Sequence, residues 1–334
     1  MGRGVEFDEI GCVILFVFGV SDRMRGFVAS KQLQEVIDHY RRVGERVTAP
    51  GLDLGQVRAI AEDIGAVNES FWSFDADVSP VDANGVPCEW ILGAGADPNR
   101  RLLCLHGGGF FLCSLHSHRP MWARISAATG CAVLAVDYRL APEHPFPAGL
   151  EDCLTAYEFM RDNGPGGPHR ADSVFVAGDS AGGNLALALL VEAKERGLDL
   201  PDAAVAMSPG TDATASGESR TSRIDVDPIV PVVGQLVASL GVAYVQDPSL
   251  VRDPRVSPLF GDLAGLPPLL VQVGDAEILL SDSTMFVDNA LAAGVDATVE
   301  VWEDMPHVFH AFAGFLPEAD QALSHIAEFL QDHS

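Results

Sequence analysis

One serine of the chain stands in a sequence setting that suits nucleophilic attack. Residues 178–182 read Gly-Asp-Ser-Ala-Gly and fit the pattern G-x-S-x-G, with an apolar run (174–177) before them and an Ala/Leu-rich run (184–193) after them. The glycines permit a sharp turn from strand to helix, which lifts Ser180 into a strained, exposed position. The N-terminus of the following helix favours negative charge nearby. The pattern predicts Ser180 as a nucleophile; the alternative is a glycine-rich turn with an incidental serine.

Three consecutive glycines follow a second apolar run. Residues 106–110 read His-Gly-Gly-Gly-Phe, directly after an expected strand. Attack of a serine on an acyl carbon creates an oxyanion, which needs N–H donors, and glycines let backbone amides approach it unobstructed. We expect the amides of Gly108, Gly109 and Ala181 to be these donors. A flexible surface loop is the alternative interpretation of the glycines.

The segments that must position both motifs alternate along the chain. Short, nearly uniform apolar runs alternate with longer amphipathic segments, which is typical of parallel strands buried under helices on both faces. Residues 69–92 show a β-like pattern around the Asn84-Gly85 turn and predict an antiparallel opening to the sheet. The fold class is therefore α/β, with a mostly parallel central sheet. The expected buried strands are 101–106, 132–137, 173–177, 203–207, 269–273 and 297–301.

Two segments outside this alternation predict helical additions. Apolar residues over 24–47 have helical spacing, and the segment from Thr211 to about Val256 is too long for a simple connection, so we expect a lid with at least one helix there. Residues 1–23 precede the first clearly amphipathic segment, and we hypothesise that they are an unusual extension or upstream sequence translated with the gene. The expected division is an N-terminal extension with cap helices (1–65), a first core part (66–210), a cap or lid insertion (211–256) and a second core part (257–334).

The two glycine motifs together resemble those of the hormone-sensitive-lipase-like (bacterial family IV type) esterases of the α/β-hydrolase superfamily. That group pairs HGGGF with GDSAGGN, and the resemblance extends from about residue 25 to the C-terminus, including Asp-Tyr-Arg-Leu-Ala-Pro-Glu at 137–143 and Leu-Pro-Pro at 266–268. The resemblance implies an α/β-hydrolase fold with a helical cap and ester hydrolysis without a metal or organic cofactor. It also implies structural, not catalytic, roles for His106 and Glu143.

A general base must follow the nucleophile in the chain order of this fold. His307, in Met-Pro-His-Val-Phe-His at 305–310, matches the base of the family by position, whereas His310 is expected in packing or a polar network. A His-x-x-His pair also suits a metal, but no further ligand cluster accompanies it in the sequence. His116 and His118 follow the glycine motif and are expected to be solvated or to cap a helix.

The triad acid is where the sequence departs from the family. Many relatives carry Asp-Pro-Leu, whereas residues 277–279 read Glu-Ile-Leu, which sets Glu277 where the aspartate would stand. A carboxylate there would hold the imidazole in the correct tautomer and stabilise the imidazolium. The predicted triad is Ser180, Glu277 and His307, with Asp275 as the alternative acid and Asp282 in a structural hydrogen bond.

The composition limits the partners and the location. Residues Asp and Glu number 47 against 21 Lys and Arg, and the net charge of −26 repels phosphate backbones and anionic lipids, so we expect no nucleic-acid partner. The apolar run 12–20 is too short to span a bilayer and follows acidic residues, which argues against a signal peptide or membrane anchor. Six cysteines without a CxxC pair favour reduced thiols and a cytoplasmic location.

The sequence therefore predicts a serine carboxylesterase whose partner is a small-molecule ester. The resemblance implies short- to medium-chain acyl esters as substrates and a homodimer through the C-terminal strand and helix. The same triad could cleave another acyl bond, in an amide, carbamate or lactone. The rival from a different class is a non-catalytic small-molecule receptor, because plant gibberellin receptors resemble the same group but lack the triad histidine, which is present here as His307.

Overall fold

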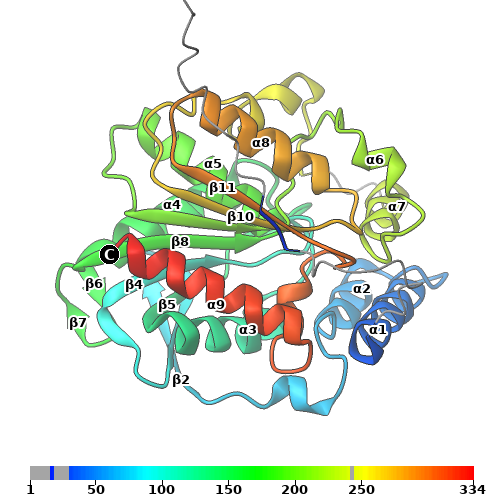
Figure 1. Cartoon of the computed structure of the whole chain (residues 1–334), viewed down its shortest axis with the longest axis horizontal. Helices are drawn as coiled ribbons and strands as arrows, with labels where there is room; N and C mark the ends of the chain where they lie inside the picture. The colour runs from blue at the N-terminus through cyan, green and yellow to red at the C-terminus, as the bar shows by residue number, and fades with distance from the viewer. Residues whose placement is uncertain (1–15, 19–29, 241–243) are drawn as a thin grey trace, which may run out of the picture.

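The computed structural model describes residues 16–18, 30–240 and 244–334, and a nine-stranded sheet runs through its centre (Figure 1). The strand order is β1-β11-β10-β9-β8-β4-β5-β3-β2, and only the β5-β3 and β3-β2 pairs are antiparallel within this described sheet. The strands are β1 Phe16–Phe18, β2 Ala76–Ala83, β3 Val86–Gly93, β4 Asp97–Leu105, β5 Cys131–Val136, β8 Ser173–Asp179, β9 Ala203–Met207, β10 Leu269–Gly274 and β11 Ala297–Trp302, and a separate two-stranded ribbon joins β6 Asn163–Gly164 to β7 Gly167–Pro168.

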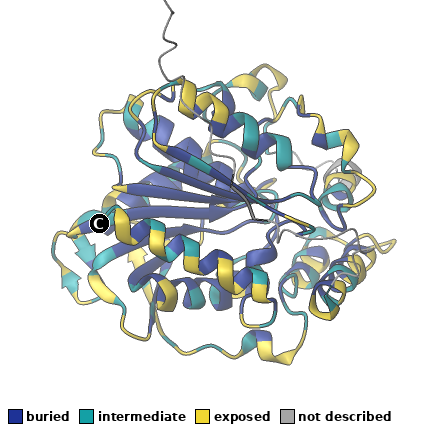
Figure 2. Ribbon diagram, in the orientation of Figure 1, coloured by how far each residue is buried: buried dark blue, intermediate teal, exposed yellow. Residues whose placement is uncertain are grey.

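Helices cover both faces of the sheet. The helices α4 (Ala148–Asp162), α5 (Ala181–Glu195) and α8 (Leu280–Ala292) pack on one face, and α3 (Leu115–Thr129) and α9 (Pro317–Asp332) pack on the other. The central strands are buried on both faces, whereas the outer helix faces are exposed (Figure 2). This sandwich confirms the α/β class, because near-uniform apolar runs such as β5 remain buried only between two helical layers.

The predicted strands and hairpin match the structure except at their ends. The strand β4 begins at Asp97, before the expected start at Arg101, and its register against β5 shifts between these two residues. The β-like reading of Glu69–Trp72 is wrong, since these residues form a 3₁₀ helix. The reason is local: the Asn68 side chain accepts a hydrogen bond from the amide of Ser70 and turns the chain.

Three helices pack together beyond the end of the sheet. They are α1 (Lys31–Val47), α2 (Leu54–Ala61) and α7 (Val230–Leu240), and their contacts include Val43, Val57 and Leu236 in one apolar cluster. The helix α1 begins after Ser30, whose side chain accepts from the amide of Leu33. The lid segment 211–256 was expected to contain at least one helix. It contains two in its described part, the short helix α6 (Ser219–Ser222) and α7.

The hypothesis about residues 1–23 and the start of amphipathic spacing at Met24 fall largely outside the described residues. Of that region, the structure describes β1, which pairs in parallel with β11 so that Val17 lies opposite Val301. In the described ranges, every helix is too short or too polar to cross a bilayer.

Candidate active site

Ser180 lies at the turn between β8 and α5, as the G-x-S-x-G pattern predicts. Its backbone has φ 52° and ψ −117°, a conformation that non-glycine residues rarely adopt. Glycines are required on both sides because the chain segments touch: a Cβ at Gly182 would collide with the carbonyl of Leu105, and one at Gly178 would collide with the carbonyl of Gly182. The surrounding structure thus holds the serine in the strained turn.

A chain of hydrogen bonds joins Ser180 to Glu277 through His307. The His307 Nε2 atom lies 2.9 Å from Ser180 Oγ, and His307 Nδ1 lies 2.6 Å from Glu277 Oε2. Glu277 is fully buried, and its Oε1 accepts from Ser208 Oγ at 2.6 Å and from the amide of Gly274 at 2.9 Å. The structure therefore brings together the three side chains of the predicted triad, which come from loops after three different strands.

Sequence reasoning missed two residues that hold this arrangement. Ser208 follows β9, and its Oγ donates to Glu277 while accepting from the amide of Val308 at 3.1 Å, so it links the loops of the acid and the base. Tyr40, on α1, donates its hydroxyl to the carbonyl of His307 at 2.9 Å. The position of Ser208 directly after an expected strand was a usable signal, since ligand sites in parallel sheets lie beyond the carboxyl ends of the strands.

The alternative acid and the second histidine contact other partners. The Asp275 carboxylate accepts from the amide of Asp304 at 2.7 Å, and burial raises its pKa. His310 is buried with its Nε2 atom 3.0 Å from Gln272 Oε1, and burial lowers its pKa to about 3. His310 thus lies in a polar network, as expected. Within the described ranges, no three His, Cys, Asp or Glu side chains are grouped so that they could hold a metal ion.

The predicted oxyanion donors lie around Ser180 with their amides unpaired. Gly108 and Gly109 have φ values of 114° and 64°, and Ala181 is the first residue of α5. In the described part of the chain, none of these three amides donates to a protein acceptor. Gly108 and Gly109 line the first cavity at Ser180, and Gly109 and Ala181 line the second.

The buried pair of Asp179 and His118 lies against the glycine loop. The amide of Gly107 donates to Asp179 Oδ1 at 3.1 Å, and Asp179 Oδ2 lies 3.3 Å from His118 Nε2. The expectation of a solvated His118 is therefore wrong, because the first turn of α3 packs this ring against Asp179. His116 is exposed and stacks on Trp72, with 4.7 Å between ring centroids.

The two residues that the resemblance implies to be structural are held in contacts with their surroundings. His106 is buried, stacks on Tyr138 with 4.3 Å between ring centroids, and has its pKa lowered to about 3 by burial and by the neighbouring His118. Glu143 accepts from both terminal nitrogens of Arg58 on α2, at 2.8 Å each. These contacts tie the start of the glycine loop to Tyr138, and the segment 137–143 to α2.

Two cavities meet at Ser180. The first, of about 270 Å³, is lined largely by apolar side chains, Val233 among them, and also by His307 and Tyr40. The second, of about 280 Å³, extends past Ala181 and Tyr244. Ser180 therefore has space on two sides.

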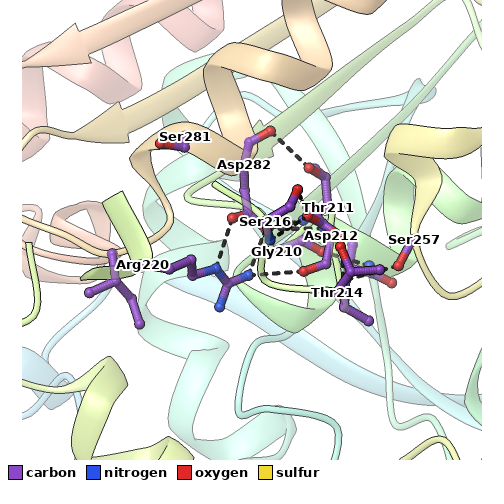
Figure 3. A network of polar contacts seen from close by, with 12 residues as sticks. Gly210, Thr211, Asp212, Thr214, Ser216, Arg220, Ser257, Ser281 and Asp282 are labelled. Carbon is purple, nitrogen blue, oxygen red and sulfur yellow. Dashed lines mark hydrogen bonds and ion pairs between the residues drawn. The ribbon is translucent and has the colours of Figure 1, made fainter. Parts of the chain in front are cut away.

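A polar network ties the start of the lid segment to α8 (Figure 3). Asp282 accepts from the amides of Thr211 and Asp212 at 2.9 and 3.1 Å. It also forms a two-point ion pair with Arg220, at 3.0 Å to Nε and 2.7 Å to Nη2. The expected structural hydrogen bond of Asp282 is confirmed, and the segment 211–220 is anchored to the helix that follows Glu277.

The sheet topology, the elbow at Ser180 and the glycine loop define the class of an α/β hydrolase. A family model of the alpha/beta hydrolase fold matches residues 102–311. An acetyl-hydrolase of Streptomyces hygroscopicus is 41% identical over 245 residues, which cover 73% of this chain and 79% of the relative. An esterase of Acinetobacter venetianus is 38% identical over 253 residues, covering 75% and 81%.

Solved structures narrow the class to a family. The crystal structure of an esterase from the bacterial hormone-sensitive lipase family superposes with a TM-score of 0.80 at 41% identity, covering 92% of this chain and 99% of that one. The chain belongs to the bacterial hormone-sensitive-lipase-like esterases of the α/β-hydrolase fold.

Proposed function

We propose that the protein hydrolyses short- to medium-chain carboxylic esters, with Ser180 as nucleophile, His307 as general base and Glu277 as the acid that orients the base. The reaction class, carboxylic-ester hydrolysis, follows from family membership. The observation that carries the assignment of roles is the unbroken hydrogen-bond chain from Ser180 Oγ through both nitrogens of His307 to Glu277.

The proposed reaction has two halves. Ser180 Oγ attacks the carbonyl carbon while His307 Nε2 accepts the hydroxyl proton, and the amides of Gly108, Gly109 and Ala181 donate to the oxyanion. The tetrahedral intermediate collapses as His307 returns the proton to the leaving alcohol oxygen, which leaves an acyl group on Ser180. A water molecule, deprotonated by His307, then attacks the acyl carbon. The bond between that carbon and Ser180 Oγ breaks, His307 returns the proton to Oγ, and the carboxylic acid leaves.

The two cavities support a division between the arms of the ester. The base must protonate the leaving oxygen, and His307 lines the first cavity but not the second, so we assign the alcohol to the first and the acyl chain to the second. The second cavity, about 280 Å³, lies near the small end of the range for ligand pockets, which supports short to medium acyl chains.

A bulky substitution in the second cavity is expected to discriminate between acyl chains, and one in the first cavity between alcohols. Ala213 is exposed and borders the second cavity but not the first. Ala213→Trp should therefore lower kcat/KM for p-nitrophenyl octanoate about tenfold more than for p-nitrophenyl acetate. Val233 borders the first cavity, so Val233→Phe should lower kcat/KM for naphthyl acetate more than for p-nitrophenyl acetate. Steady-state kinetics on both ester series measure the two ratios, and the reverse pattern would exchange the assignments of the cavities.

We also propose that the helices of the N-terminal part (1–65, an extension with cap helices) and the insertion 211–256 form a cap over a core made of 66–210 and 257–334, to whose sheet β1 adds an edge strand. The packing of Val43 and Val57 against Leu236 joins helices from the two cap segments. Tyr40 and Val233, from these same segments, line the cavity at Ser180, which supports a role for the cap in substrate selection.

The proposed location is the cytoplasm and the proposed assembly is a homodimer. The free, buried state of Cys88, Cys104, Cys113, Cys131 and Cys153 supports a reducing compartment. A dimer through the C-terminal strand and helix would need the outer edge of β11, which β1 occupies.

Release of that edge is expected to favour the dimer. The substitution Val17→Pro removes a backbone N–H from β1 and weakens its pairing with β11, which frees an edge for a second copy. Light scattering at micromolar concentration should show more dimer for Val17→Pro than for the wild type. A monomer in both proteins would contradict the homodimer, and equal dimer in both would contradict competition by β1.

A further inference from the structure

One buried carboxylate connects the cap helix α7 with the loop of the proposed triad acid. Asp227 Oδ1 accepts from the amides of Ile229 and Val230 at 3.0 and 2.9 Å, which caps the start of α7. Asp227 Oδ2 accepts from the amide of Ile278 at 2.9 Å. Since Ile278 follows Glu277 directly, a single side chain fixes the first turn of α7 and the peptide beside the acid.

The same helix forms part of the substrate cavity. Val230, Pro231, Val233 and Gly234, in the first half of α7, line the cavity that contains His307. A movement of α7 would therefore change the cavity wall and, through Asp227, the position of the acid loop.

We propose that Asp227 is a positioning residue of the triad, which holds Glu277 in place through Ile278 while α7 covers the cavity, and whose charge supports the imidazolium of His307. This inference rests on the proposed function. It assigns Asp227 no contact with the substrate. Its effect on the reaction passes through Glu277 and His307.

Charged and polar groups from several elements act on His307. Three of them are carboxylates: Glu277 in the loop after β10, Asp227 at the start of α7 and Asp179 at the end of β8. His310 lies in the turn that follows His307, and its pKa is lowered, which favours its neutral form. The Tyr40 hydroxyl, on α1, donates to the backbone carbonyl of His307. Burial lowers the pKa of His307, but the carboxylates of Glu277, Asp227 and Asp179 together outweigh burial and raise it above 6.5.

The position requires a group that only accepts hydrogen bonds. Three amide N–H groups point at the two oxygens of Asp227, and burial raises the pKa of this carboxyl, so these donors are needed to keep it ionised. An asparagine offers one oxygen and would turn an NH₂ group toward an amide of α7 or of Ile278. At least one buried N–H would lose its acceptor, which loosens one side of the connection.

The test compares Asp227→Asn with Asp225→Asn, an exposed residue of the same loop whose substitution changes the net charge equally. For p-nitrophenyl acetate we expect kcat of Asp227→Asn to fall about 10- to 100-fold with a smaller change in KM, because the triad loses its alignment. The neutral form of His307 is the active one, so activity rises as pH increases through its pKa. Removal of a nearby negative charge lowers that pKa and should shift the acidic limb of kcat/KM to lower pH.

Asp225→Asn should leave both the rate and the pH profile unchanged. A fall in kcat of Asp227→Asn with an acidic limb at the wild-type position would overturn the proposal in favour of a purely structural role, and an unchanged kcat would overturn it outright. If circular dichroism shows that Asp227→Asn does not fold, Asp227→Glu is measured instead. This variant keeps the negative charge, so kcat should fall while the acidic limb of kcat/KM stays at the wild-type pH. A wild-type kcat in Asp227→Glu would overturn the proposal. Wild-type activity in the same assay separates this outcome from failure of the proposed function.

Discussion

Replacement of Ser180 by alanine is expected to lower kcat for p-nitrophenyl acetate by about 10⁴-fold or more. The hydroxyl is the only polar group of the serine side chain, and its hydrogen bond to His307 Nε2 is the first link of the proposed triad. The amides of Gly108, Gly109 and Ala181 remain in the variant, so a small residual rate above the uncatalysed one is expected. Initial rates of p-nitrophenol release measure the loss.

The control is Ser79→Ala, which removes an exposed serine hydroxyl on β2. Ser79→Ala should retain wild-type kinetics, and both variants should unfold at similar temperatures, because alanine at 180 adopts the same strained backbone without a new clash. A Ser180→Ala protein with more than a tenth of the wild-type activity would contradict the role of this serine.

The second large effect is expected at the acid. In Glu277→Gln, the amide oxygen can still accept from Ser208 and Gly274, which leaves the NH₂ group facing His307 Nδ1. A donor at that position forces the ring proton onto Nε2, so the imidazole can no longer accept the proton of Ser180. We expect kcat to fall by about 10⁴-fold, with little change in the melting temperature.

Asp275→Asn is the matched control for this prediction. Its carboxylate accepts only from the amide of Asp304 among the described residues, and an asparagine oxygen can accept the same bond. We expect kcat to remain within about threefold of the wild type, as for substitutions away from the reacting groups. A large loss in Asp275→Asn together with an active Glu277→Gln would show that the acid is misassigned while leaving the reaction class intact.

The sequence predicts the parts of the site that depend on local backbone geometry. The elbow at Ser180 and the glycine loop at 106–110 require glycines at fixed spacing, and such requirements are visible in a single sequence. Glu277 and His307 could be aligned only through the resemblance, because their distance in the chain from Ser180 is set by loops and the cap. The buried strands are visible as apolar runs for the same local reason, whereas the ends of β4 and the 3₁₀ helix at Glu69–Trp72 depend on register and side-chain caps.

The residues that the sequence does not reveal act through tertiary contacts. Tyr40 reaches His307 from a helix near the other end of the chain, and Asp227 reaches Ile278 from the lid segment. Neither residue has neighbours that distinguish it from other buried tyrosines or helix-capping aspartates. His118 resembles a solvated residue in the sequence because its partner, Asp179, lies 61 residues further along the chain, at the end of β8. These contacts are set by how helices and loops pack at the end of the sheet.

The measurement that tests the central claim most directly is detection of the acyl-enzyme. The wild type is mixed with p-nitrophenyl acetate, quenched in acid within one turnover, digested and examined by peptide mass spectrometry. The account predicts one acetyl group on the peptide that contains Ser180, located on the Ser180 hydroxyl and absent after the same treatment of Ser180→Ala. Release of p-nitrophenol with the acetyl group on another residue, or with no acetylated peptide at any quench time, would contradict it.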